Sequence, residues 1–302
     1  MRIYIFIIII ILVGIVYFIP DTKKDFFKLY QKNDAASNAL KTFYKKPVKT
    51  VKVNGIEWKY LTSGNSDKTL LFLHGMGGAY DIWWQQVVEF EKDYKVITYT
   101  LPEEIDNLDD AAKGISAILE KEKTDKFSAV GTSMGGYIAQ YLLKTMPERL
   151  EKVVFGNTFP PNDEIIKENK IKSRIVPLLP EIVIDYLGVK QLKSKLLPAA
   201  GSNKKLLKSF LSSLPFSKKG FIHRYYIVVD FFTINPSLDK YKRIPKLIIE
   251  SDNDPLVSPN LRRDLKSLYS DAEVYTFHNE GHFPYINAAD EYNRVLRSFL
   301  QK

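Results

Sequence analysis

The chain has 302 residues, of which 45% are hydrophobic and 26% are charged, as is typical of a globular protein rather than a disordered one. It contains no cysteine, which excludes disulfides, thiolate metal sites and cysteine nucleophiles. The net charge of +9 comes from lysine-rich stretches without the arginine and aromatic clusters of base-stacking surfaces, so we expect no nucleic-acid partner.

Residues 1–20 read MRIYIFIIIIILVGIVYFIP, and the stretch from Ile3 to Ile19 carries no charge. As a helix this stretch would be about 25 Å long, at the short end of what crosses a hydrocarbon core. The following YFIPDTKK lacks the small residues of a signal-peptidase site. We therefore predict a single-pass anchor that holds the protein at a membrane, with a cleaved or lost signal as the alternative. Basic residues on both sides leave the orientation open.

Residues 21–48 form a predicted juxtamembrane connector, in which aromatic residues stand among lysines. Its helical spacing allows it to lie along a membrane surface, and a solvated helical spacer is the alternative. Next come two β-prone runs, VKTVKV and IEWKYL, separated by Asn54-Gly55. Asn-Gly between two such runs predicts a β-hairpin.

Beyond the hairpin, apolar runs alternate with helical patterns. We expect strands at 69–73, 95–100, 127–130, 152–156, 246–250 and 273–277, and helices at 80–90, 109–121, 136–145, 260–269 and 290–300. Continuous apolar strands separated by helices predict an α/β fold, with a mostly parallel central sheet flanked by helices and joined by right-handed crossovers.

The strand rhythm stops between about residues 159 and 241. Prolines there separate short apolar and basic helical segments, and residues 163–224 contain 13 Lys or Arg against 5 Asp or Glu. An insertion between two strands of one sheet predicts a basic helical lid rather than a separate domain. Residues 49–302 are thus expected to form one domain that includes this lid.

The segment GTSMG, residues 131–135, fits the G-x-S-x-G pattern of a nucleophile elbow. A strand is predicted directly before it and a helix directly after it, so the turn would be tight and would expose the hydroxyl of Ser133. Ser133 is therefore the candidate nucleophile.

A serine nucleophile needs a base, and the chain has four histidines. His282 lies between the last predicted strand and the last helix, at the sheet edge where Ser133 is expected, and is the candidate base. We interpret the others as structural: His223 on the lid surface, His278 at a strand end, and His74 bonded to its own loop.

The base needs an orienting carboxylate, and the segment LIIESDNDPLVSP offers Asp252 and Asp254. We choose Asp254 because the Asp-Pro pair sets a turn. We expect Asp252 either to face solvent or to support the site from behind Asp254. The oxyanion of a tetrahedral intermediate would be bound by the backbone N–H groups of Met134 and Met76, with Gly77 as the alternative to Met76.

In this order, LFLHGMGG, VGTSMGGYIAQYL, NDPLVSP and EGHFPYINAADEYNRVLRSFL resemble the α/β-hydrolase superfamily from about residue 49 onward. A serine at the elbow argues against the dehalogenase and epoxide hydrolase branches, which use aspartate. TYTLPEEIDNLDD replaces the usual Asp-x-Arg-Gly-x-Gly segment, and Ser251 stands where a glycine usually precedes the acid loop. In these features and in VVFGNTFPP the chain also resembles maspardin and its relatives, some of which are thought to be binding proteins.

The resemblance implies a serine hydrolase that cleaves a carboxylic ester through an acyl-enzyme, without cofactor or metal, and the predicted anchor would place it at a membrane. An apolar pocket under a basic lid near a bilayer would suit a lipid or another acyl substrate. The alternative is that the apolar residues of the lid only pack onto the domain and that its lysines are only solvated. The alternatives are a thioesterase or acyltransferase on the same triad, and a non-catalytic binding protein with this fold.

Overall fold

The computed structural model describes residues 24–169, 172–201, 203–214 and 216–302. These residues contain an eight-stranded sheet in the order β1-β2-β4-β3-β5-β6-β7-β8. The strands are β1 Val48–Val53, β2 Ile56–Ser63, β3 Thr69–Leu73, β4 Lys95–Thr100, β5 Phe127–Thr132, β6 Leu150–Gly156, β7 Lys246–Ser251 and β8 Glu273–Phe277. Strands β3 to β8 pair in parallel, whereas β2 pairs antiparallel with β1 and β4. The predicted α/β fold with a mostly parallel sheet is confirmed.

The predicted hairpin joins β1 to β2. Val53 pairs with Ile56 across the turn, and Asn54 and Gly55 adopt φ values of 50° and 81°. Asparagine and glycine tolerate this left-handed conformation at little cost, so the turn residues suit the right-handed twist of the strands.

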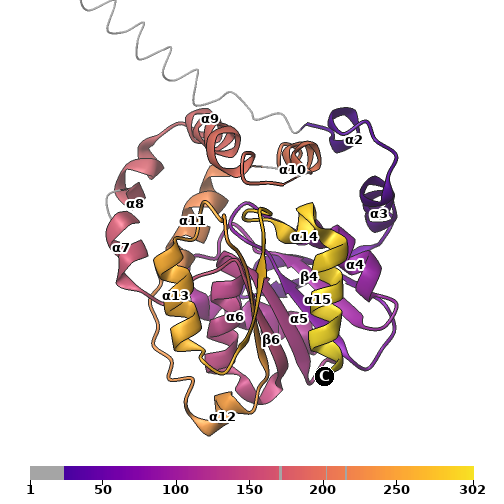
Figure 1. Cartoon of the computed structure of the whole chain (residues 1–302), viewed down its shortest axis with the longest axis vertical. Helices are drawn as coiled ribbons and strands as arrows, with labels where there is room; N and C mark the ends of the chain where they lie inside the picture. The colour runs from indigo at the N-terminus through magenta and orange to yellow at the C-terminus, as the bar shows by residue number, and fades with distance from the viewer. Residues whose placement is uncertain (1–23, 170–171, 202, 215) are drawn as a thin grey trace, which may run out of the picture.

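Helices cover both faces of the sheet and enclose two buried hydrophobic clusters. One face is covered by α5, α6 and α13, and the other by α3, α4 and α15, as Figure 1 shows. Their bounds, with the shorter elements beside them, are α3 Ala35–Tyr44, η1 Tyr80–Trp83, α4 Trp84–Phe90, α5 Leu108–Lys121, α6 Met134–Thr145, η2 Pro147–Arg149, α13 Pro259–Leu268, α14 Pro284–Asn287 and α15 Ala289–Gln301. Strand β3, which reads TLLFL, is buried along its whole length because both faces of the sheet are covered there, whereas the edge strands β1 and β8 are partly exposed.

The segment before the sheet packs into the second cluster. It contains α2 (Phe26–Leu29) and α3, and the side chains of Phe26, Leu40 and Phe43 are at most 4% exposed. The indole of Trp84 donates a hydrogen bond of 3.0 Å to the carbonyl of Ala36. The described part of this segment is therefore neither a solvated spacer nor a surface-lying helix. The division of the chain at residue 48 stays a prediction.

Between β6 and β7 the chain forms a series of short helices, called the insertion below. They are α7 Asp163–Asn169, α8 Lys172–Ile175, η3 Val176–Leu178, α9 Glu181–Gln191, η4 Leu192–Leu196, α10 Lys204–Leu211, α11 Lys218–Val229 and α12 Asp239–Lys242. Figure 1 shows α7 to α11 over one end of the sheet, with α2 near α10, and α12 at the opposite end. Since α12 leads into β7, the larger group covers the carboxyl ends of the parallel strands.

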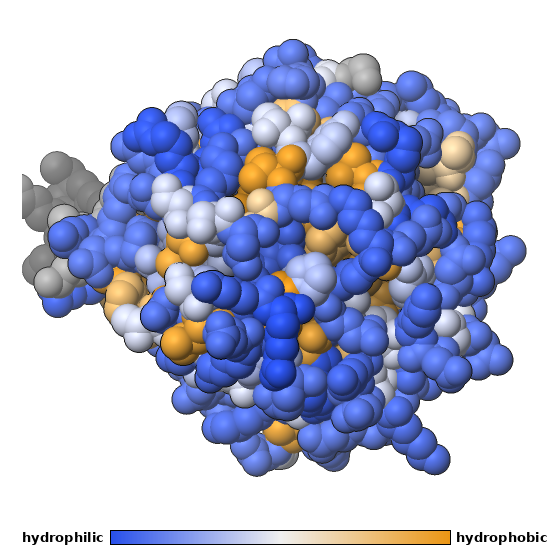
Figure 2. Space-filling model, turned by 60° about the horizontal axis from the view of Figure 1, so that its bottom comes forward, coloured by the Kyte–Doolittle hydropathy of each residue, from blue (hydrophilic) through white to orange (hydrophobic). Residues whose placement is uncertain are grey.

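The insertion is packed unevenly. Leu206, Leu207 and Phe210 of α10 are buried, whereas Leu178 is 72% exposed and Tyr186 is 66% exposed. Figure 2 brings forward the opposite end of the molecule, where α12 lies, and there hydrophilic residues cover most of the surface with small hydrophobic areas between them. Exposed apolar side chains on that side are scattered, as is normal for protein surfaces.

The predicted membrane location is contradicted. None of the helices in the part of the chain that the structure describes is both long enough and apolar enough to cross a bilayer. The anchor predicted at residues 1–20 lies outside the described residues. The assignment of the protein to a membrane is therefore withdrawn.

Candidate active site

Ser133 occupies the turn between β5 and α6, with φ 54° and ψ −122°. Non-glycine residues rarely adopt a positive φ, and such strain marks a nucleophile elbow. The neighbouring glycines allow the close approach of the backbones. A Cβ on Gly131 would lie 2.1 Å from the carbonyl oxygen of Gly135, and one on Gly135 would lie 2.2 Å from that of Leu73. Ser133 itself is partly exposed, as a nucleophile must be.

The structure brings the predicted acid and base into contact. Nδ1 of His282 lies 2.8 Å from Oδ2 of Asp254 and 3.0 Å from Oδ1, and both residues are buried. The carboxylate also accepts the N–H groups of Leu256 and Val257. Burial acts to raise the pKa of Asp254, but His282 and these hydrogen bonds outweigh it and hold that pKa below its usual value. Asp254 therefore stays ionised and can orient the imidazole.

The end of β6 and the residue after it connect this pair to the elbow. The N–H of Ser133 donates to the carbonyl of Gly156 at 2.9 Å. The side-chain amide of the next residue, Asn157, donates to Oδ2 of Asp254 at 2.9 Å and to the carbonyl of Gly281 at 3.2 Å. Asn157 is buried with φ 40°, a conformation that asparagine tolerates better than most residues. One side chain thus ties the acid loop and the base loop together.

The elbow is fixed from the same segment. The hydroxyl of Thr158 donates to the carbonyl of Ser133 at 2.7 Å. The hydroxyl of Ser133 makes no hydrogen bond to His282 within the residues that the structure describes. Catalytic hydrogen bonds often form only when substrate is bound, so this geometry is compatible with a triad.

The two predicted oxyanion donors lie on opposite sides of Ser133 in the chain. Met134 is the first residue of α6, where helix N–H groups have no partner within the helix. Neither its N–H nor that of Met76 is hydrogen-bonded to any described residue. A Cβ on Gly75 would lie 3.2 Å from Cβ of Ser133, so the loop that carries Met76 passes close to the candidate nucleophile.

His74 holds this loop in place. Its Nε2 accepts the N–H of Leu101 at 3.0 Å, so Nδ1 carries the hydrogen and donates to the carbonyl of Gly75 at 2.7 Å. Burial, with a smaller contribution from the charge of Arg224, lowers the pKa of His74 to about 3. The ring is therefore neutral at physiological pH, in agreement with the structural role expected for it.

A family model described as the Alpha/beta hydrolase family matches residues 70–295, about three quarters of the chain. The chain belongs to this family. Two proteins that the chain resembles in sequence are an esterase and a lactonase. Pimeloyl-[acyl-carrier protein] methyl ester esterase of Hamiltonella defensa is 24% identical over 251 residues, covering 79% of this chain and 95% of the esterase. 3-Oxoadipate enol-lactonase 2 of Acinetobacter baylyi is 28% identical over 118 residues.

The lactonase match covers 36% of this chain and only 44% of the lactonase, less than half its length. Among solved structures, a membrane phospholipase A that is a bacterial virulence factor superposes with a TM-score of 0.67. It is 18% identical, and the match covers 100% of this chain and 98% of that one. This last likeness concerns the fold alone and says nothing of location. The family and the two relatives support an ester-hydrolysing enzyme.

The remaining carboxylate candidate of this alpha/beta hydrolase lies outside the site. Asp252 accepts a hydrogen bond of 2.7 Å from His278, and their side chains are 43% and 78% exposed. Asp252 also accepts the N–H of Asn279. These residues form a surface pair that holds the turn before His282, as the sequence led us to expect.

Sequence reasoning missed the residues that position the site. Asn157 and Thr158 follow β6 at the carboxyl edge of the sheet, and polar residues at a strand end are a signal that could have found them. Arg224 lies in α11 of the insertion and donates to the loop that carries Met76. Nothing in its local sequence distinguishes it from the other basic residues of the insertion.

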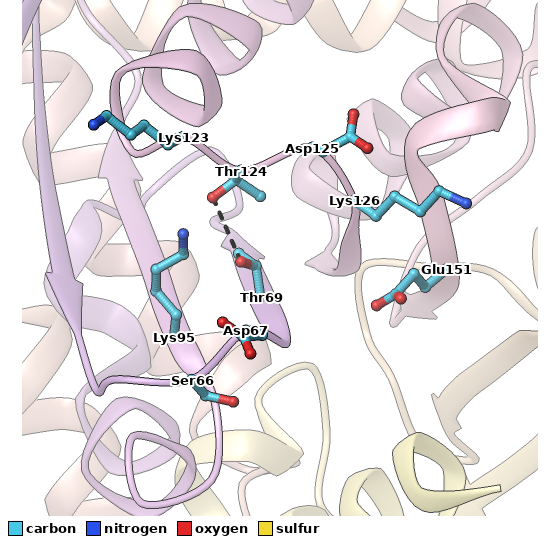
Figure 3. Close-up of a pocket in the computed structure, with 9 residues that line it drawn as sticks. All are labelled: Ser66, Asp67, Thr69, Lys95, Lys123, Thr124, Asp125, Lys126 and Glu151. Atoms are coloured by element: carbon cyan, nitrogen blue, oxygen red, sulfur yellow. Dashed lines mark hydrogen bonds between the residues drawn. The ribbon is translucent and has the colours of Figure 1, made fainter.

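A cavity of about 310 Å³ lies elsewhere in the alpha/beta hydrolase domain (Figure 3). It opens at the amino ends of β3, β4, β5 and β6, opposite the edge that carries Ser133. Lysines and carboxylates line it in equal number, and Thr69 and Thr124 are hydrogen-bonded to each other at 3.4 Å. Its lining residues are Ser66, Asp67, Thr69, Lys95, Lys123, Thr124, Asp125, Lys126 and Glu151. The cavity is therefore separate from the candidate active site.

Proposed function

We propose that this alpha/beta hydrolase cleaves a carboxylic ester with Ser133 as nucleophile, His282 as general base and Asp254 as the carboxylate that orients the imidazole. The observation that carries the proposal is the buried hydrogen bond between Asp254 and His282, which Asn157 links to the elbow. Folding alone does not require a buried carboxylate and an imidazole beside a strained serine.

In the first half of the reaction, Oγ of Ser133 attacks the carbonyl carbon while Nε2 of His282 takes the hydroxyl proton. The N–H groups of Met76 and Met134 stabilise the negative oxygen of the tetrahedral intermediate. The bond to the leaving oxygen then breaks, and His282 gives its proton to the departing alcohol. The product is an acyl-enzyme on Ser133.

In the second half, a water molecule loses a proton to Nε2 of His282 and attacks the acyl carbon. The intermediate collapses, the acid leaves, and Oγ of Ser133 recovers the proton. Throughout, Asp254 keeps the hydrogen of the imidazole on Nδ1, so that Nε2 remains free to accept.

We propose a lipid or another acyl compound as substrate. The insertion covers the end of the sheet that carries Ser133 (Figure 1), and it contributes buried apolar side chains such as Ile184, Leu192 and Ile227. A site walled by such side chains would favour an acyl chain over a polar group.

The nucleophile is tested by labelling the full chain with a fluorophosphonate probe. We expect one covalent label on the wild type and on Ser267→Ala, a variant at an exposed position of α13, and none on Ser133→Ala. An unlabelled wild type, or a labelled Ser133→Ala, would contradict the proposal. A panel of p-nitrophenyl esters from acetyl to dodecanoyl tests the substrate class, and a preference for acetyl would contradict an acyl-chain pocket.

A further inference from the structure

We propose that Arg224 is a positioning residue that couples the insertion to the oxyanion-hole loop, residues 74–78. On this view the loop presents its N–H groups to the oxyanion only while α11 is docked against it. The inference rests on the proposed function and deepens it, because it adds a side chain outside the triad and a dependence of catalysis on the insertion.

The contacts of Arg224 are unusual for a charged side chain. Nη1 donates to the carbonyl of Met76 at 2.7 Å and to that of Gly78 at 2.9 Å, and Nη2 donates to the carbonyl of Leu101 at 3.3 Å. All the hydrogen bonds that it makes to described residues go to backbone carbonyl oxygens. One guanidinium thus bridges the loop after β3 and the loop after β4.

The guanidinium of Arg224 is largely buried, so its contacts matter for the energy of the fold. It lowers the pKa of Arg224 to about 10, so the guanidinium is still charged at neutral pH, and Nε is buried without a hydrogen-bond partner. A buried cation is costly unless oriented dipoles replace its water shell. Here the carbonyls of the two loops are those dipoles, so the loops must keep this conformation for α11 to pack as it does.

Planarity of the peptide group converts these contacts into the orientation of the donors. In a trans peptide the N–H points away from the preceding C=O. The carbonyl of Gly75 accepts from His74 Nδ1 and from the N–H of Gly78, which directs the N–H of Met76 the other way. The carbonyl of Met76 accepts from Arg224, which fixes the N–H of Gly77, the alternative donor, in the same manner. Arg224 thus acts on the N–H of Met76 through the loop as a whole and not through the peptide that carries it.

Arg224 also supports the second anchor of the loop. His74 is held by the N–H of Leu101, and the carbonyl of the same residue accepts from Arg224. The side chain from the insertion therefore acts on the loop directly at Met76 and Gly78, and indirectly through Leu101 and His74. Loss of the guanidinium would release both contacts together.

The experiment compares Arg224→Met, Arg224→Lys and the control Arg174→Met with the wild type, all as full chains. Arg174 is an exposed arginine of the same insertion, so its variant removes an equal charge. The first readout is hydrogen–deuterium exchange of a peptide spanning residues 74–80. The N–H groups of Gly78 and Tyr80 are hydrogen-bonded at 3.0 Å, and their exchange reports the order of the loop.

We expect faster exchange of this peptide in Arg224→Met, while peptides of the central strands exchange as in the wild type. We expect kcat for an acyl ester to fall about 10- to 100-fold with little change in KM, less than the loss of a whole oxyanion donor. Millimolar guanidinium ion should restore part of the activity of Arg224→Met, and methylammonium should not. Arg224→Lys should lie in between, because an ammonium cannot bridge three carbonyls in one plane.

Exchange and kcat equal to those of Arg174→Met would overturn the proposal. A uniform rise in exchange over all peptides of both Arg224 variants would do the same, since it would mean general destabilisation. A wild type that the fluorophosphonate does not label would refute the proposed function instead. In that case the exchange of residues 74–80 alone would still decide whether Arg224 holds the loop.

Discussion

Two groups of residues flank Ser133, and they are built differently. The proposed acid–base side consists of Asp254, His282 and Asn157, and the side chain of Asp254 contacts the other two directly. The oxyanion side consists of backbone N–H groups on the loop of residues 74–78, which His74 and Arg224 hold in place. The acid–base side is defined by the identity of its side chains, whereas the oxyanion side is defined by the conformation of a loop. The difference teaches that reactive side chains can all be in place while remote contacts decide whether the backbone N–H groups are aligned.

The largest effect should come from Asp254→Asn on the acid–base side. An amide in place of the carboxylate favours the wrong tautomer of His282, so we expect kcat to fall about 10⁴-fold. The matched control is Asp252→Asn, which alters the exposed pair with His278 and should leave kcat within about threefold of the wild type. Steady-state kinetics on an acyl ester measure both. Equal losses of kcat in the two variants would contradict the choice of Asp254 over Asp252 as the carboxylate that orients His282.

Next is Asn157→Gly, which keeps the positive φ accessible and removes the whole side chain with its amide. We expect kcat to fall about 10- to 100-fold, because small displacements of a catalytic pair are costly. The hydrogen bond from Asn157 helps to lower the pKa of Asp254, so its loss should raise that pKa. The acidic limb of the pH profile of kcat should then move to higher pH. An unchanged profile would argue that Asn157 holds the loops without acting on the acid.

On the oxyanion side, His74 makes stability depend on pH. The folded ring has a pKa of about 3, whereas the unfolded ring has its ordinary value of about 6.5. Between these values the unfolded chain binds the proton and the folded chain does not, so stability present above pH 6.5 is lost as pH falls. From pH 7 to pH 5 the free energy of unfolding should drop by about 2 kcal/mol from this group. Urea titrations of wild type and His74→Asn test this, and equal slopes with pH would contradict it.

The smallest effect should come from Thr158→Val, which acts on the elbow that both sides share. The variant keeps the shape that packs on Gly136 and removes the hydrogen bond to the carbonyl of Ser133. We expect about 1 kcal/mol of destabilisation and a loss of kcat of only a few fold. Urea titration and kinetics measure the two quantities. A kcat loss as large as that of Asn157→Gly would contradict this ranking and would show that activity depends on the elbow as strongly as on Asn157.

The sequence predicted the fold because the strands carry their own signal. Residues 69–73 are almost entirely apolar, and residues 247–249 form the apolar centre of 246–250; both segments lie in fully buried strands. The order of Ser133, Asp254 and His282 likewise follows from local motifs at strand ends. The helix after the elbow begins at Met134, two residues before the predicted position, since the turn is tighter than the glycines suggested.

The remaining features depend on contacts between distant parts of the chain. Arg224 is one basic residue among many until α11 brings it against residues 76–78. The aromatic residues of the first segment resemble a surface helix because their partners, on α4 and α10, lie far along the chain. Such packing has no periodicity of its own and becomes visible only in the folded molecule.

Packing of the first segment sets where the folding unit can be cut. The family match begins at residue 70, yet the ring of Phe26 lies 6.2 Å from that of Phe210, which lies 4.3 Å from that of Trp84. A fragment that begins at the hairpin would lack Phe26, and the rings that it covers would become exposed to solvent. Large exposed apolar patches promote aggregation, so the insoluble behaviour of such a fragment would be a defect of its boundary and not of its catalytic residues.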